Sequence, residues 1–200
     1  RSGILSVFGG SPIMGPLAAL VLACIFFATQ TDKFLTGANF SLILQQVMVV
    51  GTLAIGQTLV ILTGGIDLSN GMIMALSSVL MTGLAVRSGM NPILAILVGL
   101  LVCVVFGLLN GSLVTMIRLP PFIVTLGTFN IAYALVRIYT TSTITRLPPA
   151  LLFFGSTFTL GGTEITYGSV LMVILYIITW FILRSTPTGR AVYAVGDNPE

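Results

Sequence analysis

Six long apolar runs dominate the chain, and short polar or Pro/Gly-rich breaks separate them. A helix that crosses the hydrocarbon of a bilayer needs about 20 mostly apolar residues, and each run is close to that length. The pattern therefore predicts six membrane spans. They cover residues 12–29, 41–62, 68–86, 92–117, 121–139 and 165–183.

The composition supports a location in the bilayer. The 200 residues include eight Lys and Arg and five Asp and Glu, whereas 56% are apolar. So few charges cannot cover the surface of a water-soluble domain. We therefore predict an all-α, polytopic transmembrane helical bundle, with a single transmembrane domain over residues 1–200. Because the chain starts at Arg1 rather than Met and stops at Glu200 within a polar segment, we expect it to be truncated at the C-terminus.

Several kinds of chemistry are excluded by the residues present. Histidine is absent, and Cys24 and Cys103 each lie alone in an apolar run, which argues against a metal site or a disulfide. No span carries paired carboxylates or a serine beside a general base, so we predict no enzyme active site. The sequence has no basic cluster of the kind that binds nucleic acid, so we expect no nucleic-acid partner. Lys33, the only lysine, is far from any Gly-rich phosphate loop, so any ATP used must be hydrolysed by another subunit.

The segment "GQTLVILTGGIDLSNG" (residues 56–71) contains the main polar break. Full-length spans fit on both sides, so the break is expected at a membrane surface. The first interpretation is a turn in which both glycines permit positive φ and Asp67 or Ser69 caps the next helix. The second is a gate or a partner contact, because ionisable residues beside spans are often functional. The turn comprises Thr63, Gly64, Gly65 and Asp67.

Uncharged polar side chains occur within several spans. Lipid offers them no hydrogen-bond partner, so they must face other helices or a water-filled path. Interhelical bonding explains most of them, but the same groups fit a route for a neutral, hydroxyl-rich solute. A proton- or ion-coupled carrier would keep buried ionisable groups instead. The candidates for the translocation path are Gln46, Gln57, Asn110, Thr125 and Asn130.

Two further patterns concern packing. Small residues recur at every fourth position of the run 92–117, at Gly99, Cys103, Gly107 and Gly111, and such a ridge lets another helix approach closely. The connection 140–164 is too apolar at residues 147–154 for a solvated loop, so we expect a small helix on the outer rim that could receive a partner.

Three segments resemble a known family. They are "GQTLVILTGGIDLSNG" (56–71), "LPPFIVTLGTFNIAYAL" (119–135) and "STPTGRAVYAVGDNPE" (185–200). They are similar to the permease subunits of bacterial monosaccharide ABC importers of the ribose, xylose, arabinose and fructose type, in a superfamily that includes branched-chain amino-acid permeases. The resemblance implies a multi-pass protein of the inner membrane that pairs with a second permease copy, as a homodimer or with a close paralogue.

The resemblance also implies partners and an orientation. A periplasmic sugar-binding protein would deliver the solute, and two cytoplasmic ATPase subunits would hold ATP and Mg. Six spans place both ends of the chain on one face, and the arginine count does not decide which. The resemblance implies that this face is cytoplasmic.

In this family the segment like 184–200 leads into the coupling helix that contacts the ATPase. The candidate coupling residues are Gly189, Arg190, Gly196, Asp197, Asn198 and Glu200. Locally, Pro187 ends the sixth span, Gly189 permits a reversal, and Asp197 or Asn198 caps a new helix that starts at Pro199. An ordinary loop to a further span is the alternative.

Two other functions are compatible with the sequence. The chain could be a permease for branched-chain amino acids or another small solute of the same superfamily. It could also be a passive channel or facilitator, which would need no ATPase.

Overall fold

The computed structural model describes residues 13–197, and helices form most of this part of the chain. Five helices are long and apolar enough to cross a membrane, and a sixth apolar helix is shorter at 17 residues. Each predicted span corresponds to one of these helices, which confirms the helical bundle. The six helices are α2 (Met14–Gln30), α3 (Gly37–Leu62), α4 (Asn70–Arg87), α5 (Pro92–Thr115), α6 (Pro121–Tyr139) and α8 (Tyr167–Ser185).

Polar residues determine where several of these helices begin. Thr36 caps α3 by accepting a hydrogen bond from the Asn39 N–H, so α3 starts four residues earlier than predicted. Asn91 caps α5 in the same way and places Pro92 at the first helical position. Thr166 caps α8, where its hydroxyl accepts from the Ser169 N–H.

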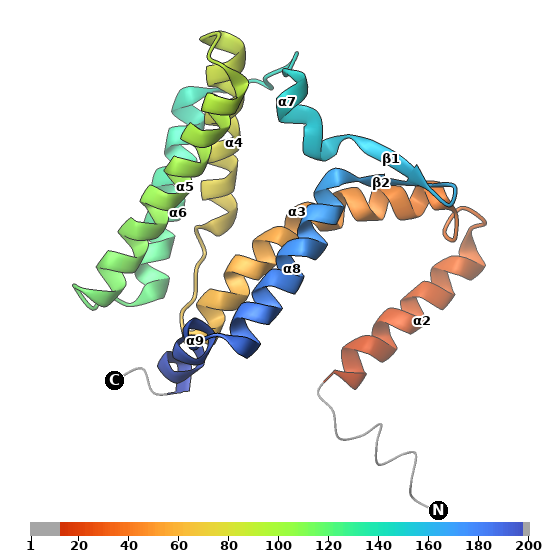
Figure 1. Cartoon of the computed structure of the whole chain (residues 1–200), viewed down its shortest axis with the longest axis horizontal. Coiled ribbons are helices and arrows are strands. Elements are labelled where there is room, and N and C mark those ends of the chain that lie inside the picture. The colour runs from red at the N-terminus through yellow and green to blue at the C-terminus, as the bar shows by residue number, and fades with distance from the viewer. Residues whose placement is uncertain (1–12, 198–200) are drawn as a thin grey trace, which may run out of the picture.

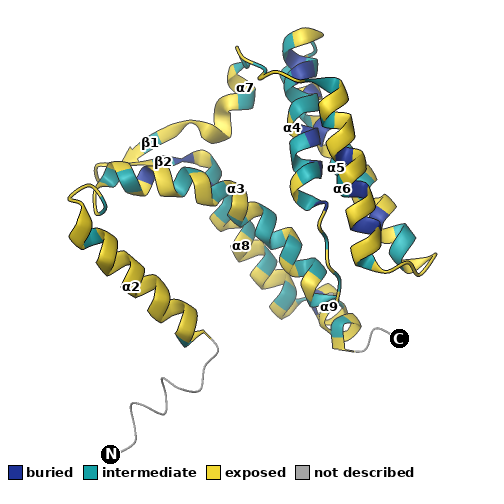
Figure 2. Ribbon diagram, turned by 180° about the vertical axis from the view of Figure 1, so that it is seen from behind, coloured by how far each residue is buried: buried dark blue, intermediate teal, exposed yellow. Residues whose placement is uncertain are grey.

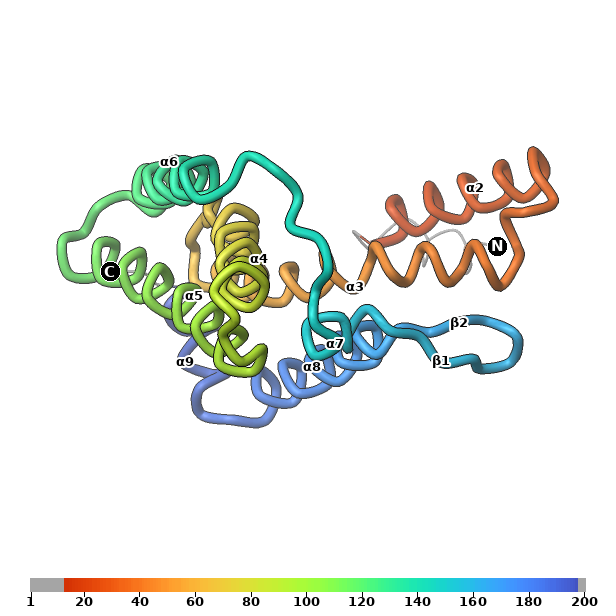
Figure 3. The backbone as a smooth tube through the Cα atoms, turned by 90° about the horizontal axis from the view of Figure 1, so that it is seen from above, coloured from red at the N-terminus to blue at the C-terminus, as the bar shows by residue number. Residues whose placement is uncertain are grey.

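The long helices form two groups that diverge from one end of the molecule (Figure 1). In the first group, α4 packs between α5 and α6, and Ile73, Leu76 and Ala132 form its buried core. In the second group, α3 packs against α8 and against α9 (Pro187–Asp197). Buried residues are concentrated in the first group (Figure 2). Helix α2 has no buried residue and stands apart from both groups (Figure 1), although it projects beside the first half of α3 when seen from above (Figure 3).

The small-residue ridge of α5 has two different environments. A Cβ atom at Gly99 would lie 2.8 Å from Met81 Cε and 3.0 Å from Ser77 Oγ, so glycine allows α4 to approach closely here. The Ser77 hydroxyl donates to the Gly99 carbonyl at 2.8 Å. By contrast, Gly107 and Gly111 are exposed, with no heavy atom of the described residues within 4 Å of an added Cβ. Their role in packing stays a prediction and concerns a partner outside these helices.

Gly107→Leu is expected to leave the fold of the subunit intact and to weaken its association with a neighbour, because the new side chain separates two closely packed backbones. Size-exclusion chromatography in detergent measures the loss of the native oligomer. Val105→Leu, which adds bulk to the same exposed helix outside the ridge, is the control. An unchanged oligomer in Gly107→Leu would contradict the packing role.

The connection after α6 contains the expected short helix and an unexpected hairpin. Helix α7 (Pro149–Leu152) and the 3-10 helix η1 (Phe153–Gly155) lie within the apolar stretch. They precede β1 (Thr157–Leu160) and β2 (Thr163–Thr166), which pair antiparallel with Leu160 opposite Thr163. The predicted start of the sixth span at residue 165 is therefore wrong, since Ile165 and Thr166 belong to β2.

A local signal for this hairpin is present in the sequence. Gly161 and Gly162 separate two short Thr-rich runs, and both adopt positive φ, 59° and 82°. A two-residue turn of this kind matches the twist of paired strands, and glycine adopts it without steric cost. The hairpin lies along the first half of α3 (Figure 1).

The connections lie at two opposite ends of the molecule (Figure 1). Helix α9 and the start of α2 lie at the same end as the α3–α4 connection. At the other end, Arg87 of α4 donates hydrogen bonds to the Tyr139 carbonyl at 3.2 Å and to the Thr140 hydroxyl at 2.9 Å. Arg87 therefore ties the end of α4 to the end of α6.

Candidate functional site

The polar break predicted from sequence forms the α3–α4 connection, residues 63–69. Its first part closes α3: Gly64 N–H donates to the Ile61 carbonyl and Gly65 N–H to the Val60 carbonyl, both at 2.9 Å. Gly64 has φ +76°, as expected for a glycine that ends a helix. Gly65 does not adopt positive φ, so that part of the prediction is wrong. A Cβ at Gly65 would instead lie 3.0 Å from Val60 Cγ1.

The Asp67 side chain stabilises the connection itself. Asp67 Oδ1 accepts hydrogen bonds from the Ser69 N–H at 2.7 Å and from the Ser69 hydroxyl at 2.6 Å. Ser69 occupies the N-cap position of α4 but makes no side-chain cap hydrogen bond. Ser69 therefore does not cap α4, and Asp67 bonds to the N–H of the N-cap residue rather than to the first turn, so the prediction that either side chain caps the helix is wrong.

Two of the predicted path residues hold this connection. Asn110 of α5 donates from Nδ2 to the Ser69 hydroxyl at 2.9 Å, and Thr125 Oγ1 of α6 lies 3.1 Å from the Ile66 carbonyl and shares its single proton between this carbonyl and that of Pro121. Ser69 is completely buried, and Asn110 and Thr125 are 7% and 4% exposed. Tertiary hydrogen bonds therefore account for these two polar residues.

These bonds also place the connection relative to the ends of α5 and α6. Asn110 lies more than one turn before the end of α5, and Thr125 lies one turn after the start of α6. Residues 66–69 therefore run alongside α5 and α6 rather than beyond their ends (Figure 1). The expectation that the break lies at the membrane surface stays a prediction. Helix α4 has 18 residues and spans about 27 Å, so it can begin within the bundle.

The other three path candidates lie elsewhere. Gln46 is exposed and Gln57 half-buried on α3, whereas Asn130 is exposed on α6. Asn130 Nδ2 donates to the Leu126 carbonyl of its own helix at 2.8 Å. Their part in a translocation path stays a prediction.

The segment after α8 differs from the expectation. The chain enters α9 directly at Pro187, and Gly189 lies inside this helix, so the predicted reversal at Gly189 is wrong. The Thr186 hydroxyl accepts from the Gly189 N–H at 3.2 Å and so satisfies the first turn. A Cβ at Gly189 would overlap the backbone carbonyls of Ile182 and Leu183. Glycine is thus needed for the close approach of α9 to α8.

The predicted coupling residues are only partly described. Gly189, Arg190, Gly196 and Asp197 all belong to α9, and Arg190 and Asp197 are exposed. Asn198 and Glu200, with the helix predicted to start at Pro199, lie outside the described residues.

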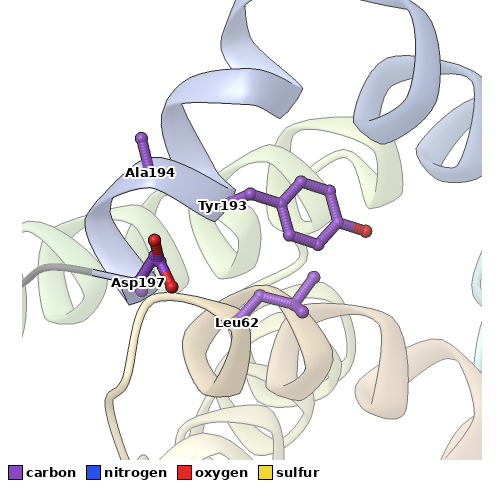
Figure 4. Close-up of a pocket in the computed structure, with 5 residues that line it drawn as sticks. Leu62, Tyr193, Ala194 and Asp197 are labelled. Atoms are coloured by element: carbon purple, nitrogen blue, oxygen red, sulfur yellow. The ribbon is translucent and has the colours of Figure 1, made fainter.

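The end of α9 rests on the end of α3. A Cβ at Gly196 would overlap the Leu62 carbonyl oxygen, so the two backbones are in direct contact. Leu62, Tyr193, Ala194, Gly196 and Asp197 line a shallow pocket, and the Leu62 and Tyr193 side chains extend toward the same space between the two helices (Figure 4). We call this contact the α3–α9 junction.

The junction brings together two regions that the sequence analysis treated separately. Leu62 directly precedes Thr63 and the glycines of the predicted turn, and Gly196 belongs to the predicted coupling segment. Leu62 and Tyr193 were missed, because an apolar helix end and a surface tyrosine carry no distinctive sequence signal. Within residues 13–197, no group of His, Cys, Asp and Glu is arranged to hold a metal ion.

The described helices define a multi-pass α-helical membrane protein with a non-helical connection packed inside its bundle. The protein family described as branched-chain amino acid transport system / permease component matches residues 39–200. The chain belongs to this family of transport-system permeases.

Individual relatives have transport-related names. The chain is 46% identical over 197 residues to the fructose import permease protein FrcC of Rhizobium meliloti, covering 95% of this chain and 55% of that protein. It is 41% identical over 188 residues to the ribose import permease protein RbsC of Bacillus subtilis, covering 92% and 57%. It is 33% identical over 184 residues to the autoinducer 2 import system permease protein LsrC of Photorhabdus luminescens, covering 90% and 54%.

The chain thus spans little more than half the length of these relatives. No solved structure matches it.

Proposed function

We propose that the chain is part of the permease subunit of an ATP-driven monosaccharide importer and forms a translocation path across the bacterial inner membrane. The observation that carries this proposal is the α3–α9 junction. A surface helix with exposed Arg190 and Asp197 follows the last described span and contacts the start of the α3–α4 connection. A passive channel has no need of a helix so placed, whereas an energy-coupled permease needs a surface that an ATPase can move.

The proposed partners follow from this role. ATPase subunits on the cytoplasmic side hold ATP and Mg and push on α9, and a second permease copy completes the path. A periplasmic binding protein delivers the solute at the opposite end. In this arrangement α9 and the start of α2 are cytoplasmic. Movement of the two copies exposes the path to one side of the membrane at a time.

The proposed solute class is a monosaccharide rather than an amino acid. Two relatives are named for fructose and ribose import, although the family description names branched-chain amino acids. The polar candidates Gln46, Gln57 and Asn130 are uncharged donors and acceptors. Such groups suit sugar hydroxyls, whereas the charged ends of an amino acid favour ionic partners.

Uptake into vesicles tests this function. The full-length permease, its ATPase and its binding protein are reconstituted, and labelled fructose, ribose and leucine are offered with and without ATP. We expect ATP-dependent accumulation of a sugar that disappears when the ATPase is omitted. Accumulation of leucine alone would contradict the solute class. Downhill sugar flux by the permease without any partner would identify a passive facilitator.

Arg190→Glu tests the role of α9. Arg190 is exposed on α9 and lines a shallow groove with Trp180, Arg184 and Tyr193, so it is available to a partner. Charge reversal is expected to leave membrane insertion intact and to reduce uptake per ATP hydrolysed about ten-fold, through loss of a charged contact at the subunit interface. Parallel assays of uptake and phosphate release measure the ratio. Arg190→Lys, which retains the charge, is the control, and unchanged coupling in Arg190→Glu would contradict the assignment.

A further inference from the structure

The α3–α4 connection joins the two helix groups, and it contacts both of them. On one side, Leu62 at the end of α3 supports Gly196 of α9. On the other side, Asn110 and Thr125 bind residues 66–69 from α5 and α6. Direct contacts between the two groups are otherwise few. The connection is therefore the main route along which a displacement of α9 can reach the α4–α5–α6 bundle.

We propose that residues 63–69 form a mechanical link between α9 and this bundle, and that Thr125 and Asn110 are positioning residues that hold the link. The inference rests on the proposed function, in which a partner ATPase moves α9. Asn70, the first residue of α4, adds to the link because its Nδ2 donates to the Leu53 carbonyl of α3 at 3.3 Å. A push on α9 then shifts α4, α5 and α6 together.

The hydrogen-bond chain at Asn110 has a defined direction. The Ser69 hydroxyl donates its single proton to Asp67 Oδ1, so it can only accept from Asn110. Asn110 therefore presents Nδ2 to Ser69, and its buried Oδ1 has no hydrogen-bond partner among the described residues. A buried acceptor without a donor costs free energy. The link therefore carries this cost in the conformation that the structure shows.

Two threonines offer a matched test of the link. The single proton of Thr125 Oγ1 is shared between the Pro121 carbonyl of its own helix at 2.9 Å and the Ile66 carbonyl of the link at 3.1 Å. Thr115 Oγ1 donates only within α5, to the Gly111 carbonyl at 2.8 Å. Substitution by valine keeps the shape and removes the hydroxyl in both cases. Of the two, only Thr125→Val removes a hydrogen bond to the link.

The reconstituted full-length transporter, with its ATPase and binding protein, is assayed for sugar uptake and ATP hydrolysis. Thr125→Val is expected to reduce uptake per ATP about five-fold, the effect of one neutral hydrogen bond, with an unchanged KM for the sugar. Thr115→Val is expected to behave as the unsubstituted transporter. Asn110→Leu, which removes the other attachment at similar volume, is expected to uncouple in the same way.

A distance measurement reports on the link without relying on transport. Spin labels at Ala191 of α9 and Ser78 of α4 lie on exposed positions of the two groups. If the link carries the motion, the distance between the labels changes little when ATP binds. In Thr125→Val the distance between the labels is expected to change on ATP binding, because α9 moves without the bundle.

The outcomes separate this inference from the proposed function. Absence of ATP-dependent uptake by the unsubstituted transporter overturns the proposed function. ATP-dependent uptake that remains fully coupled in both Thr125→Val and Asn110→Leu overturns the link alone. A raised KM with normal coupling in Thr125→Val also overturns it, since that result makes Thr125 a residue that contacts the solute.

Discussion

Gly196→Ala is expected to detach α9 from the end of α3 and to abolish most coupled transport. In an ordinary helix this substitution stabilises by about 1 kcal/mol. Here the added methyl group would overlap the Leu62 carbonyl oxygen, which cannot move away by a change of rotamer. Overpacking of this kind costs about 3 kcal/mol, so the net effect is destabilising by about 2 kcal/mol.

Hydrogen–deuterium exchange measures the detachment directly. A net loss of about 2 kcal/mol raises the open population of α9, and therefore the exchange of its amides, about 30-fold. Gly127→Ala in α6 is the matched control, because no heavy atom of the described residues lies within 4 Å of its added Cβ. The control is expected to exchange no faster than the unsubstituted protein. Slower exchange of α9 in Gly196→Ala would contradict the close contact at the α3–α9 junction.

Gly99→Leu is expected to separate α4 from α5 and to destabilise the subunit by about 3 kcal/mol. The new side chain has no space, since its Cβ alone would lie 2.8 Å from Met81 Cε and 3.0 Å from the buried Ser77 hydroxyl. Separation of the helices also breaks the bond from Ser77 to the Gly99 carbonyl. Thermal unfolding of the purified subunit in detergent measures the change.

Gly107→Leu is the comparison for this experiment, because the same substitution on the same helix meets open space within the subunit. Its thermal unfolding as an isolated subunit is expected to match that of the unsubstituted protein, even where its assembly is weakened. Equal melting temperatures for Gly99→Leu and Gly107→Leu would show that α4 and α5 do not depend on the small residue at Gly99.

The span positions could be predicted because lipid imposes a local rule. Backbone groups in the hydrocarbon must bond within their own helix, so length and apolarity alone identify a span. The ends of the helices were predicted to within a few residues, and the errors have local causes. The cap at Thr36 makes α3 begin earlier than predicted. Ile165 and Thr166, predicted to begin the sixth span, belong to the hairpin instead.

The segment after α8 shows why other local patterns were misread. Pro187 and Gly189 were interpreted as residues that end a helix and permit a reversal. Proline is equally suited to the first turn of a helix, and glycine to a close contact between backbones. Gly189 lies inside α9 because the carbonyls of α8 leave no room for a side chain there. A single sequence does not distinguish these uses, since the neighbouring atoms come from another element.

The same reason limits what the sequence could say about the site. It identified residues 63–67 and 184–200 as segments of interest, but their contact at Leu62 and Gly196 depends on how α3 and α8 pack. Asn110 and Thr125 were recognised as polar residues that need partners. Their partners, Ser69 and the Ile66 carbonyl, lie in a connection whose path between the helices was not predictable.

The sequence by itself determined that this protein is a helical membrane protein, where its long apolar helices lie, and that the candidate path residues within them are uncharged. These properties follow from the solvation of each segment in lipid, so they do not require knowledge of neighbours. Only the tertiary structure decided which polar residues bind the α3–α4 connection and where α9 rests. Hydrogen bonds and backbone contacts between distant segments are set by packing geometry, which composition and periodicity do not contain.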